Sequence, residues 1–391
     1  MARPAWRHPS NTAVAQVWKG TVTTTTNGHT YAVTITDDNG DTATITYTVV
    51  NPPDTTTTLV ATGLITAWNA SLNPLISKFT ATQSSGQVIL TADTAGRPFA
   101  FSTGGTGTWS GTGNTTEPVS NNDYGQATNW STDAAPTTND DVVLGDGSVA
   151  VKYGLDQSSA AIDEFNVSSG WTGDIGRWDD GKLHYLQIDP NSFEYRGRSQ
   201  LAAFDLGSAN IAANIQGSGT PSTTGGSAVY IKGSNLTTLT VNSGNVGVAM
   251  ADNDTATVAT VRVNQLSGVT APTVAIGSGA TLTTLSASAG TITQRCASTT
   301  TTVGADATLT TLGTGTIGTV NCYGTGYFNS TGTITDLYAY GTVDFSQSTV
   351  ARTVTNLRPQ PGCTIILASG VTVTNIIQPT NPGTYTIRVA T

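Results

Sequence analysis

The sequence predicts a mainly β protein, in which a small N-terminal α/β module is followed by a Thr/Gly-rich β-solenoid. Charged residues make up only 10% of the 391 residues, against roughly 25% in ordinary globular proteins, and glycine occurs 43 times. Threonine recurs in runs such as Thr23–Thr26 and Thr299–Thr302. Threonine favours strands and glycine favours tight turns. The C-terminal half repeats a short apolar pattern every 20–27 residues, which is typical of solenoids.

The repeat can be counted from about residue 230 onward. Each unit holds two apolar residues separated by two others, often threonine, and a glycine-containing turn often follows. The pairs are Leu236/Leu239, Val258/Val261, Leu282/Leu285, Leu309/Leu312, Ile334/Leu337 and Val354/Leu357. At ~4.8 Å between neighbouring strands, six coils would form a stack about 30 Å tall. We expect the paired residues to point inward and the threonines and serines to face solvent.

Residues 13–103 are predicted to form the α/β module. Apolar and polar residues alternate over 31–35 and 43–49, and the turn residues Asp37–Asp41 separate the two segments, as in a β-hairpin. Asp54 is the expected N-cap of an amphipathic helix of about 16 residues. The apolar face of this helix would contain Val60, Leu64, Ile65, Trp68 and Leu72. Further strands are expected over 14–22, 88–90 and 99–101.

Four other segments complete the predicted organisation. Residues 1–12 look like an extended arm, since Pro4 disfavours a helix there. Residues 104–127 are rich in Gly and Thr and are predicted to be a flexible linker. Residues 128–230 are an irregular β region that opens the solenoid, and 231–391 contain its repeats.

Charge and hydrophobicity argue against several classes of protein. The net charge of −9 is unlike that of nucleic-acid binders, which collect Lys and Arg on one face. No run of 18 apolar residues is present, so we expect no membrane-spanning helix. The N-terminal residues lack the apolar segment of a signal peptide. A Thr/Gly-rich β chain without a signal peptide is expected either to be exported by another route or to be assembled inside the cell and released by lysis.

Cysteine and histidine give no sign of a metal or cofactor site. The three cysteines, Cys296, Cys322 and Cys363, are an odd number in a long chain and are expected to be buried free thiols. Cys296 and Cys322 are 26 residues apart, so they are expected on adjacent coils. No metal-ligand spacing and no G-x-S-x-G motif occurs, and we expect no cofactor, no metal and no catalytic residues.

One segment, residues 171–198, concentrates aromatic residues, carboxylates and arginines. Aromatic rings flanked by carboxylates suit a glycan site, and two carboxylates at a fixed distance suit glycoside hydrolysis. We favour instead a non-repetitive insertion or subunit contact, stabilised by Arg–Asp pairs and aromatic packing. The candidate glycan or subunit contacts are Trp171, Trp178, Asp179, Tyr185, Tyr195 and Arg196.

Two stretches resemble phage proteins. The segments Ala67–Ala70 (AWNA) and Leu90–Phe99 (LTADTAGRPF) resemble a small module of about 90 residues that recurs in phage virion proteins. Asn129–Ser131 (NWS), followed by Asp140–Leu144 (DDVVL), resembles the opening of many extracellular and phage β-solenoids. The resemblance implies a virion-associated architecture and carries over no catalytic residue.

The resulting expectation is a non-enzymatic structural protein on the surface of a tailed-phage virion, as a capsid decoration or head fibre. Trp6 and Trp18 are the candidate attachment residues, and the major capsid protein is an expected partner. Because a six-coil solenoid would leave open strand edges and its unit length drifts, a homotrimer is expected. The alternatives are a tail fibre or tailspike that binds or cleaves host glycans, and a bacterial surface adhesin.

Overall fold

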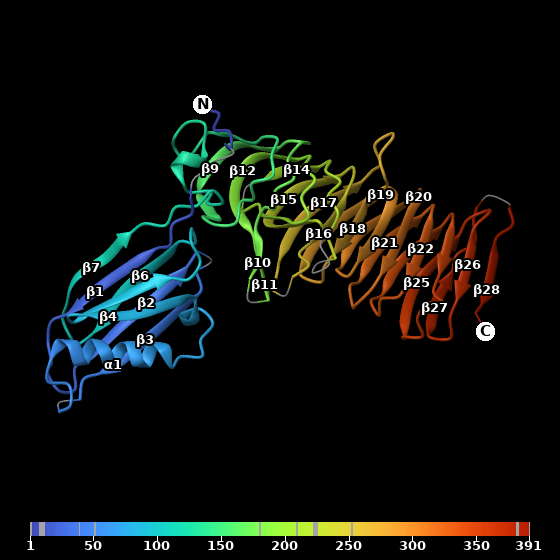
Figure 1. Ribbon diagram of the computed structural model, residues 1–391. Coiled ribbons are helices and arrows are strands. Elements are labelled where there is room, and N and C mark those ends of the chain that lie inside the picture. The colour runs from blue at the N-terminus through green and yellow to red at the C-terminus, as the bar shows by residue number, and fades with distance from the viewer. Residues whose placement is uncertain are drawn as a thin grey trace.

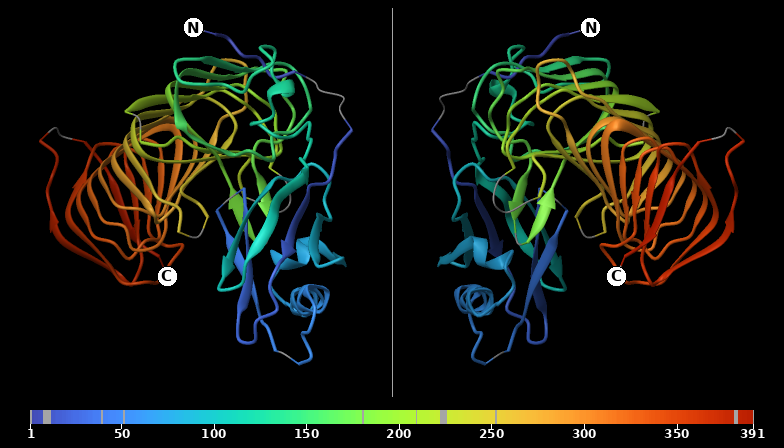
Figure 2. Two further views of the ribbon diagram at one scale, coloured as in Figure 1. Left: turned by 90° about the vertical axis from the view of Figure 1, so that its left-hand side faces the viewer. Right: turned by 90° about the vertical axis from the view of Figure 1, so that its right-hand side faces the viewer.

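The computed structural model contains 53% strand and 5% helix, and the predicted fold class is confirmed. A small N-terminal β/α module lies beside the first turns of a β-solenoid, whose later turns extend away from it (Figures 1 and 2). The structure describes residues 2–7, 12–38, 40–50, 52–179, 181–208, 210–221, 226–251, 253–380 and 383–390.

The module consists of two antiparallel sheets and one α-helix. One sheet has the order β4-β5-β1-β7 and the other β3-β2-β6, and α1 packs against β3, β4 and β5. The elements are β1 (Val17–Val22), β2 (Thr30–Asp37), β3 (Thr42–Thr48), α1 (Thr57–Asn69), the 3-10 helix η1 (Ile76–Lys78), β4 (Phe79–Ser84), β5 (Gln87–Ala92), β6 (Phe99–Gly105) and β7 (Trp109–Thr116).

The predicted hairpin is confirmed as β2 and β3, which pair from Thr30 opposite Thr48 to Thr36 opposite Thr42. The predicted helix is present but starts later than expected. Thr56, not Asp54, is its N-cap and accepts a hydrogen bond from the amide of Leu59.

The Asp54 side chain forms hydrogen bonds to residues that precede the helix. Its carboxylate accepts hydrogen bonds from the Tyr47 hydroxyl at 2.7 Å and from the Val50 amide at 2.8 Å. Partial burial, together with this carboxylate, raises the pKa of Tyr47 to about 12. Asp54 therefore ties the end of β3 to the start of the helical segment. Leu72, which was expected on the apolar helix face, lies beyond the helix and is 98% exposed.

The predicted linker over 104–127 is wrong, because much of it is strand. β6 ends at Gly105, and β7 follows as an outer strand paired with β1. Trp109, at the start of β7, packs edge-on against Tyr31 and Trp18, with ring centroids 5.1 and 6.2 Å apart. A Gly/Thr-rich composition is therefore compatible with an edge strand that one aromatic side chain fixes to the core.

The solenoid has about 12 turns and runs from residue 141 to 389, so it is longer than the six coils expected and begins well before residue 231. Its successive turns stack on one another, and their strands form two parallel sheets. The first sheet contains β8 (Asp141–Leu144), β9 (Asp156–Val167), β12 (Leu186–Tyr195), β14 (Ile211–Ile215), β15 (Val229–Val241), β17 (Ala256–Val263), β19 (Ala280–Gln294), β20 (Ser298–Thr311), β21 (Ile317–Cys322), β23 (Ile334–Ala339), β25 (Arg352–Pro359) and β27 (Val371–Ile376).

The second sheet shares the long strands with the first, because β12, β15, β19 and β20 pass from one sheet to the other. Its remaining strands are β13 (Ala202–Asp205), β16 (Asn245–Val248), β18 (Thr273–Ile276), β22 (Thr325–Phe328), β24 (Thr342–Asp344), β26 (Thr364–Leu367) and β28 (Thr386–Val389). A short 3-10 helix η2 (Ala127–Asn129) and a hairpin of β10 (Arg177–Asp179) and β11 (Lys182–His184) lie outside these sheets.

Part of the predicted repeat register is confirmed. In the first sheet Leu239 stacks on Val261, and Val261 on Leu285. The next expected pair, Leu309/Leu312, is misplaced. Leu309 lies in the second sheet between Ile292 and Gly326, and Leu312 is only half-buried.

The turn that was missed has a polar interior. Leu285 is followed in the stack by Thr301, which is fully buried. The side chains of Gln294, Ser298 and Thr301 form an internal hydrogen-bonded group, which we call the polar rung. Ser298 and Thr301 interrupt the apolar pattern of the stack. Their buried hydroxyl groups are tolerated because they are hydrogen-bonded.

The thiols also lie differently from the prediction. Cys322 neighbours Val303 and Ala339 in the stack, so Cys296 is not its partner on the adjacent turn. All three cysteines are free and buried, as expected. Burial raises the pKa of Cys322 to about 12, so this thiol stays protonated near neutral pH.

The described part of the N-terminal arm packs on its own chain. Trp6 is 4% exposed and contacts the rings of Trp130 and Tyr124 at centroid distances of 5.0 and 6.5 Å. Its amide donates a hydrogen bond to the carbonyl of Val143 at 2.9 Å. Residues 1 and 8–11 of the predicted arm lie outside the described residues. Trp6 thus covers the first turn of the solenoid and does not offer its ring to another protein.

Candidate functional site

The structure separates the six residues predicted from segment 171–198. Trp171 and Tyr195 are fully buried in the solenoid core, where they cannot contact a glycan. Arg196 is exposed and pairs with Glu194 at 2.9 Å on the solenoid surface. Trp178, Asp179 and Tyr185 lie on or next to the β10–β11 hairpin.

Asp179 belongs to a group of ion pairs between the module and the hairpin, which we call the interface ion cluster. The module contributes Asp37, Asp38, Lys78 and Arg97, and the hairpin contributes Arg177 and Asp179. None of the six charged side chains is more than 21% exposed.

The geometry of the interface ion cluster is specific. Arg177 donates two hydrogen bonds to the Asp38 carboxylate, at 2.7 and 2.8 Å. Arg97 reaches Asp179 at 2.6 Å, and Lys78 reaches the same carboxylate at 3.2 Å. Forked Arg–carboxylate pairs are directional as well as strong. The cluster therefore fixes the orientation of the module relative to the solenoid.

The cluster also determines the charge of Asp179. Burial alone would raise the pKa of this carboxyl group, but the positive charges of Arg97 and Lys78 outweigh burial and hold its pKa below the usual range. Asp179 consequently stays ionised and is unsuited to protonate a leaving group as a general acid. Its environment fits the interpretation of Arg–Asp pairing that the sequence favoured.

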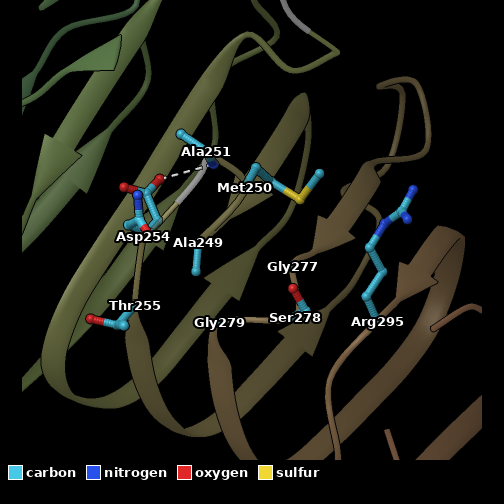
Figure 3. Close-up of a pocket in the computed structure, with 10 residues that line it drawn as sticks. Ala249, Met250, Ala251, Asp254, Thr255, Gly277, Ser278, Gly279 and Arg295 are labelled. Atoms are coloured by element: carbon cyan, nitrogen blue, oxygen red, sulfur yellow. Dashed lines mark hydrogen bonds between the residues drawn. The ribbon is translucent and has the colours of Figure 1, made fainter. Parts of the chain in front are cut away.

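The β10–β11 hairpin also borders a hollow of about 660 Å³, which we call the hairpin groove. It is lined by Trp178, Gly181, Lys182, Leu183, Lys232, Met250, Ala251, Asn253 and Asp254. A second hollow, of about 670 Å³, lies on the other side of the loop that joins β16 to β17. Figure 3 shows this second hollow with Asp254 on one side, Arg295 on the other and Met250 between them.

Within the loop between the two hollows, Asp254 is buried, with 8% of its surface exposed. This carboxylate accepts hydrogen bonds from the Tyr185 hydroxyl and, at 3.0 Å, from the Ala251 amide. Lys232 lies 3.8 Å from it, and the Lys232 ammonium sits 4.5 Å above the Tyr185 ring. Burial, with help from Asp254, raises the pKa of Tyr185, so this hydroxyl remains a hydrogen-bond donor.

The loop also contains unusual backbone. Ala249 and Asn253 have φ values of 47° and 65°, a region that costs free energy for an alanine. Ala249 is 4% exposed, so its methyl group packs against the core in this conformation. Ala249 is thus anchored in the core, and Asp254 ties Ala251 to Tyr185 beside the groove.

Sequence reasoning found Trp178 and Tyr185 but missed Lys232, Met250, Asn253 and Asp254. The available signal was weak: Ala249–Asp254 interrupts the Thr/Val-rich repeats with an Asp/Asn-containing stretch and one of only two methionines. Nothing in the sequence indicated that this stretch would meet a hairpin some 70 residues earlier.

Within the described ranges, no group of three or more His, Cys, Asp or Glu residues is arranged to hold a metal ion. Among the same residues, no helix is long and apolar enough to cross a membrane. Comparison of the chain with family models, curated proteins and solved structures found no match. The functional argument therefore depends on the geometry of this chain alone.

Proposed function

We propose that this chain is a non-enzymatic structural protein of a tailed-phage virion, a capsid decoration or head fibre that is anchored through its N-terminal part and projects its solenoid. The observation that carries the proposal is the interface ion cluster. It joins a compact module to the first turns of a long solenoid through directional, mostly buried ion pairs. A rigid junction of this kind suits a part that must point away from a surface.

The placement on a particle is tested by mass spectrometry of purified virions and immunogold labelling with antibody against the full chain. We expect the chain in stoichiometric amount on the capsid. Labelling at the tail tip would favour the tail-fibre alternative, and labelling of the cell envelope without particles would favour the adhesin.

The chain is expected to release no reducing sugar from host polysaccharide. Asp179 is paired with Lys78, Arg97 and Arg177. Glu194 is paired with Arg196 and accepts a hydrogen bond from the side-chain amide of Gln216 at 2.9 Å. Neither carboxyl group is placed as a free acid or nucleophile. The measurement is a reducing-end assay, and turnover that disappears in Asp179→Asn or Glu194→Gln would contradict the non-enzymatic proposal.

The homotrimer stays a prediction, with one of its arguments removed. The drifting unit length is accommodated within one chain, because the missed turns fill the gaps between the counted pairs. The apolar side chains of Ile376 and Val389 are 48% and 67% exposed, and exposed apolar surface favours contact with another chain. Sedimentation equilibrium at micromolar concentration measures the state, and a monomer with intact β-type circular dichroism would rule out the trimer.

A further inference from the structure

We propose that the hairpin groove binds one pyranose unit of a neutral polysaccharide, with the Trp178 ring as the stacking surface. This inference goes beyond the proposed structural role and does not depend on where in a virion the chain is placed. The juxtaposition that carries it is an aromatic ring from the β10–β11 hairpin beside Met250, Asn253 and Asp254 from a later turn.

Trp178 has the environment of a binding aromatic. It is only partly buried and lines three neighbouring hollows. Tyr230 meets it edge-on at 6.2 Å and 87°, which fixes the ring plane. Met250 adds apolar surface next to it. Sugar rings present apolar C–H faces, and partly exposed aromatic rings are suited to pack against such a face.

The polar groups of the groove favour a neutral ligand. Lys232 already lies between Asp205 and Asp254, at 3.5 and 3.8 Å, and Lys182 pairs with Asp41 at 3.2 Å. An acidic sugar would have to compete with these carboxylates for both ammonium groups. The exposed side chain of Asn253 and the remaining N–H bonds of Lys232 can instead exchange hydrogen bonds with hydroxyl groups.

The size of the groove fits the same ligand. Its volume of about 660 Å³ is within the range of roughly 300–1,000 Å³ that is typical of small-molecule sites. Asp254 is hydrogen-bonded to both Ala251 and Tyr185, so these residues are already positioned before a ligand binds, which favours affinity. The groove is open, so neighbouring units of a longer chain can continue into solvent.

The test is isothermal titration of the full chain with cellohexaose, hexa-N-acetylchitohexaose and maltohexaose. We expect at least one of them to bind with a dissociation constant of about 1 mM or lower, and Trp178→Ala to weaken that binding about tenfold or more. Trp178→Tyr, which retains a ring, should keep most of the affinity. Tyr340→Ala is the matched control, because Tyr340 is an exposed ring on a distant turn, 37% exposed.

Ala251→Trp provides a second variant that fills the groove without changing a charged residue of the interface ion cluster. It should abolish binding while leaving circular dichroism unchanged, and it decides the question if Trp178→Ala fails to fold. The proposal is overturned if none of the three oligosaccharides binds, or if Ala251→Trp binds as well as the parent chain. Either result would leave the structural role untouched, since that role is read from the location of the chain on particles.

Discussion

A chain carrying Leu285→Asp is expected to lose the solenoid fold and to aggregate on expression. Leu285 is fully buried and stacks directly between Val261 and Thr301 in the first sheet. A carboxylate at this position would have no ion-pair partner and would displace the stacked apolar side chains. An unpaired buried charge costs several kcal/mol, roughly the whole stability of many domains. Circular dichroism and sedimentation of the expressed protein measure the outcome.

Two variants with the same new charge serve as controls. Thr283→Asp lies on the same strand but is exposed, and we expect little change in melting temperature. Leu312→Asp replaces a half-buried leucine outside the stack of the first sheet, and its effect should be intermediate. If Leu285→Asp yields soluble protein that melts like the parent chain, the stacking register described here is wrong.

Arg177→Met is expected to release the N-terminal module from the solenoid and to lower stability. The Arg177 side chain is 9% exposed, forms the forked pair with Asp38, and lies 5.3 Å from the Tyr153 ring. Removal of one partner from a buried ion pair costs about 3–5 kcal/mol, because the remaining charge stays buried and unpaired. Small-angle X-ray scattering should show a larger radius of gyration, and limited proteolysis should cut between module and solenoid.

Arg196→Met is the matched control. It removes the same kind of side chain from the exposed pair with Glu194, and exposed pairs contribute less than about 1 kcal/mol. We expect unchanged scattering and a nearly unchanged melting curve. Scattering of Arg177→Met that overlays on the parent curve would show that the interface ion cluster does not hold the module in place.

The same interface should weaken in acid. The pKa of Asp179 is lower in the folded chain than in the unfolded one, so its contribution to stability is present above the unfolded pKa. This contribution is lost as the pH falls from about 4, the ordinary pKa of an aspartate, through the lowered folded value. Docking of the module should accordingly tolerate mildly acidic conditions.

The sequence predicted the elements whose hydrophobic pattern is local. The β2–β3 hairpin follows from alternation and turn residues, and α1 follows from helical spacing. β7 was missed because most of its side chains are exposed, so no alternation marks it. The helix start was misplaced because Asp54 and Thr56 are both good caps by residue type, and only the position of the Tyr47 hydroxyl decides between them.

The solenoid was recognised but undercounted for a physical reason. A turn is visible in sequence only when its inward residues are apolar, and the polar rung hides one of them. Ile317 and Val320 do match the pattern, but Leu309/Leu312 had taken their place in the count. The early turns escaped because their core side chains include Trp171 and Tyr195, which looked like surface aromatics when the direction of each side chain was unknown.

Only some of the residues at the candidate groove were predicted from the sequence. Trp178 and Tyr185 stand out by residue type in an aromatic-poor chain. Their counterpart, Asp254, is one of several aspartates and is distinguished only by the Tyr185 hydroxyl and the Ala251 amide that reach it. Contacts between residues on different turns depend on how many residues each turn contains, and that number varies along this solenoid.

The polar rung has a consequence for how its turn can form during folding. Gln294, Ser298 and Thr301 lie close together along the chain, and their side chains satisfy one another. Their hydrogen bonds need no side chain from a neighbouring turn, although Thr301 is stacked between Leu285 and Val320. Buried polar groups are tolerated when they are hydrogen-bonded. This turn therefore carries the partners of its polar interior within its own sequence, and it can join the stack without leaving these three side chains unpaired.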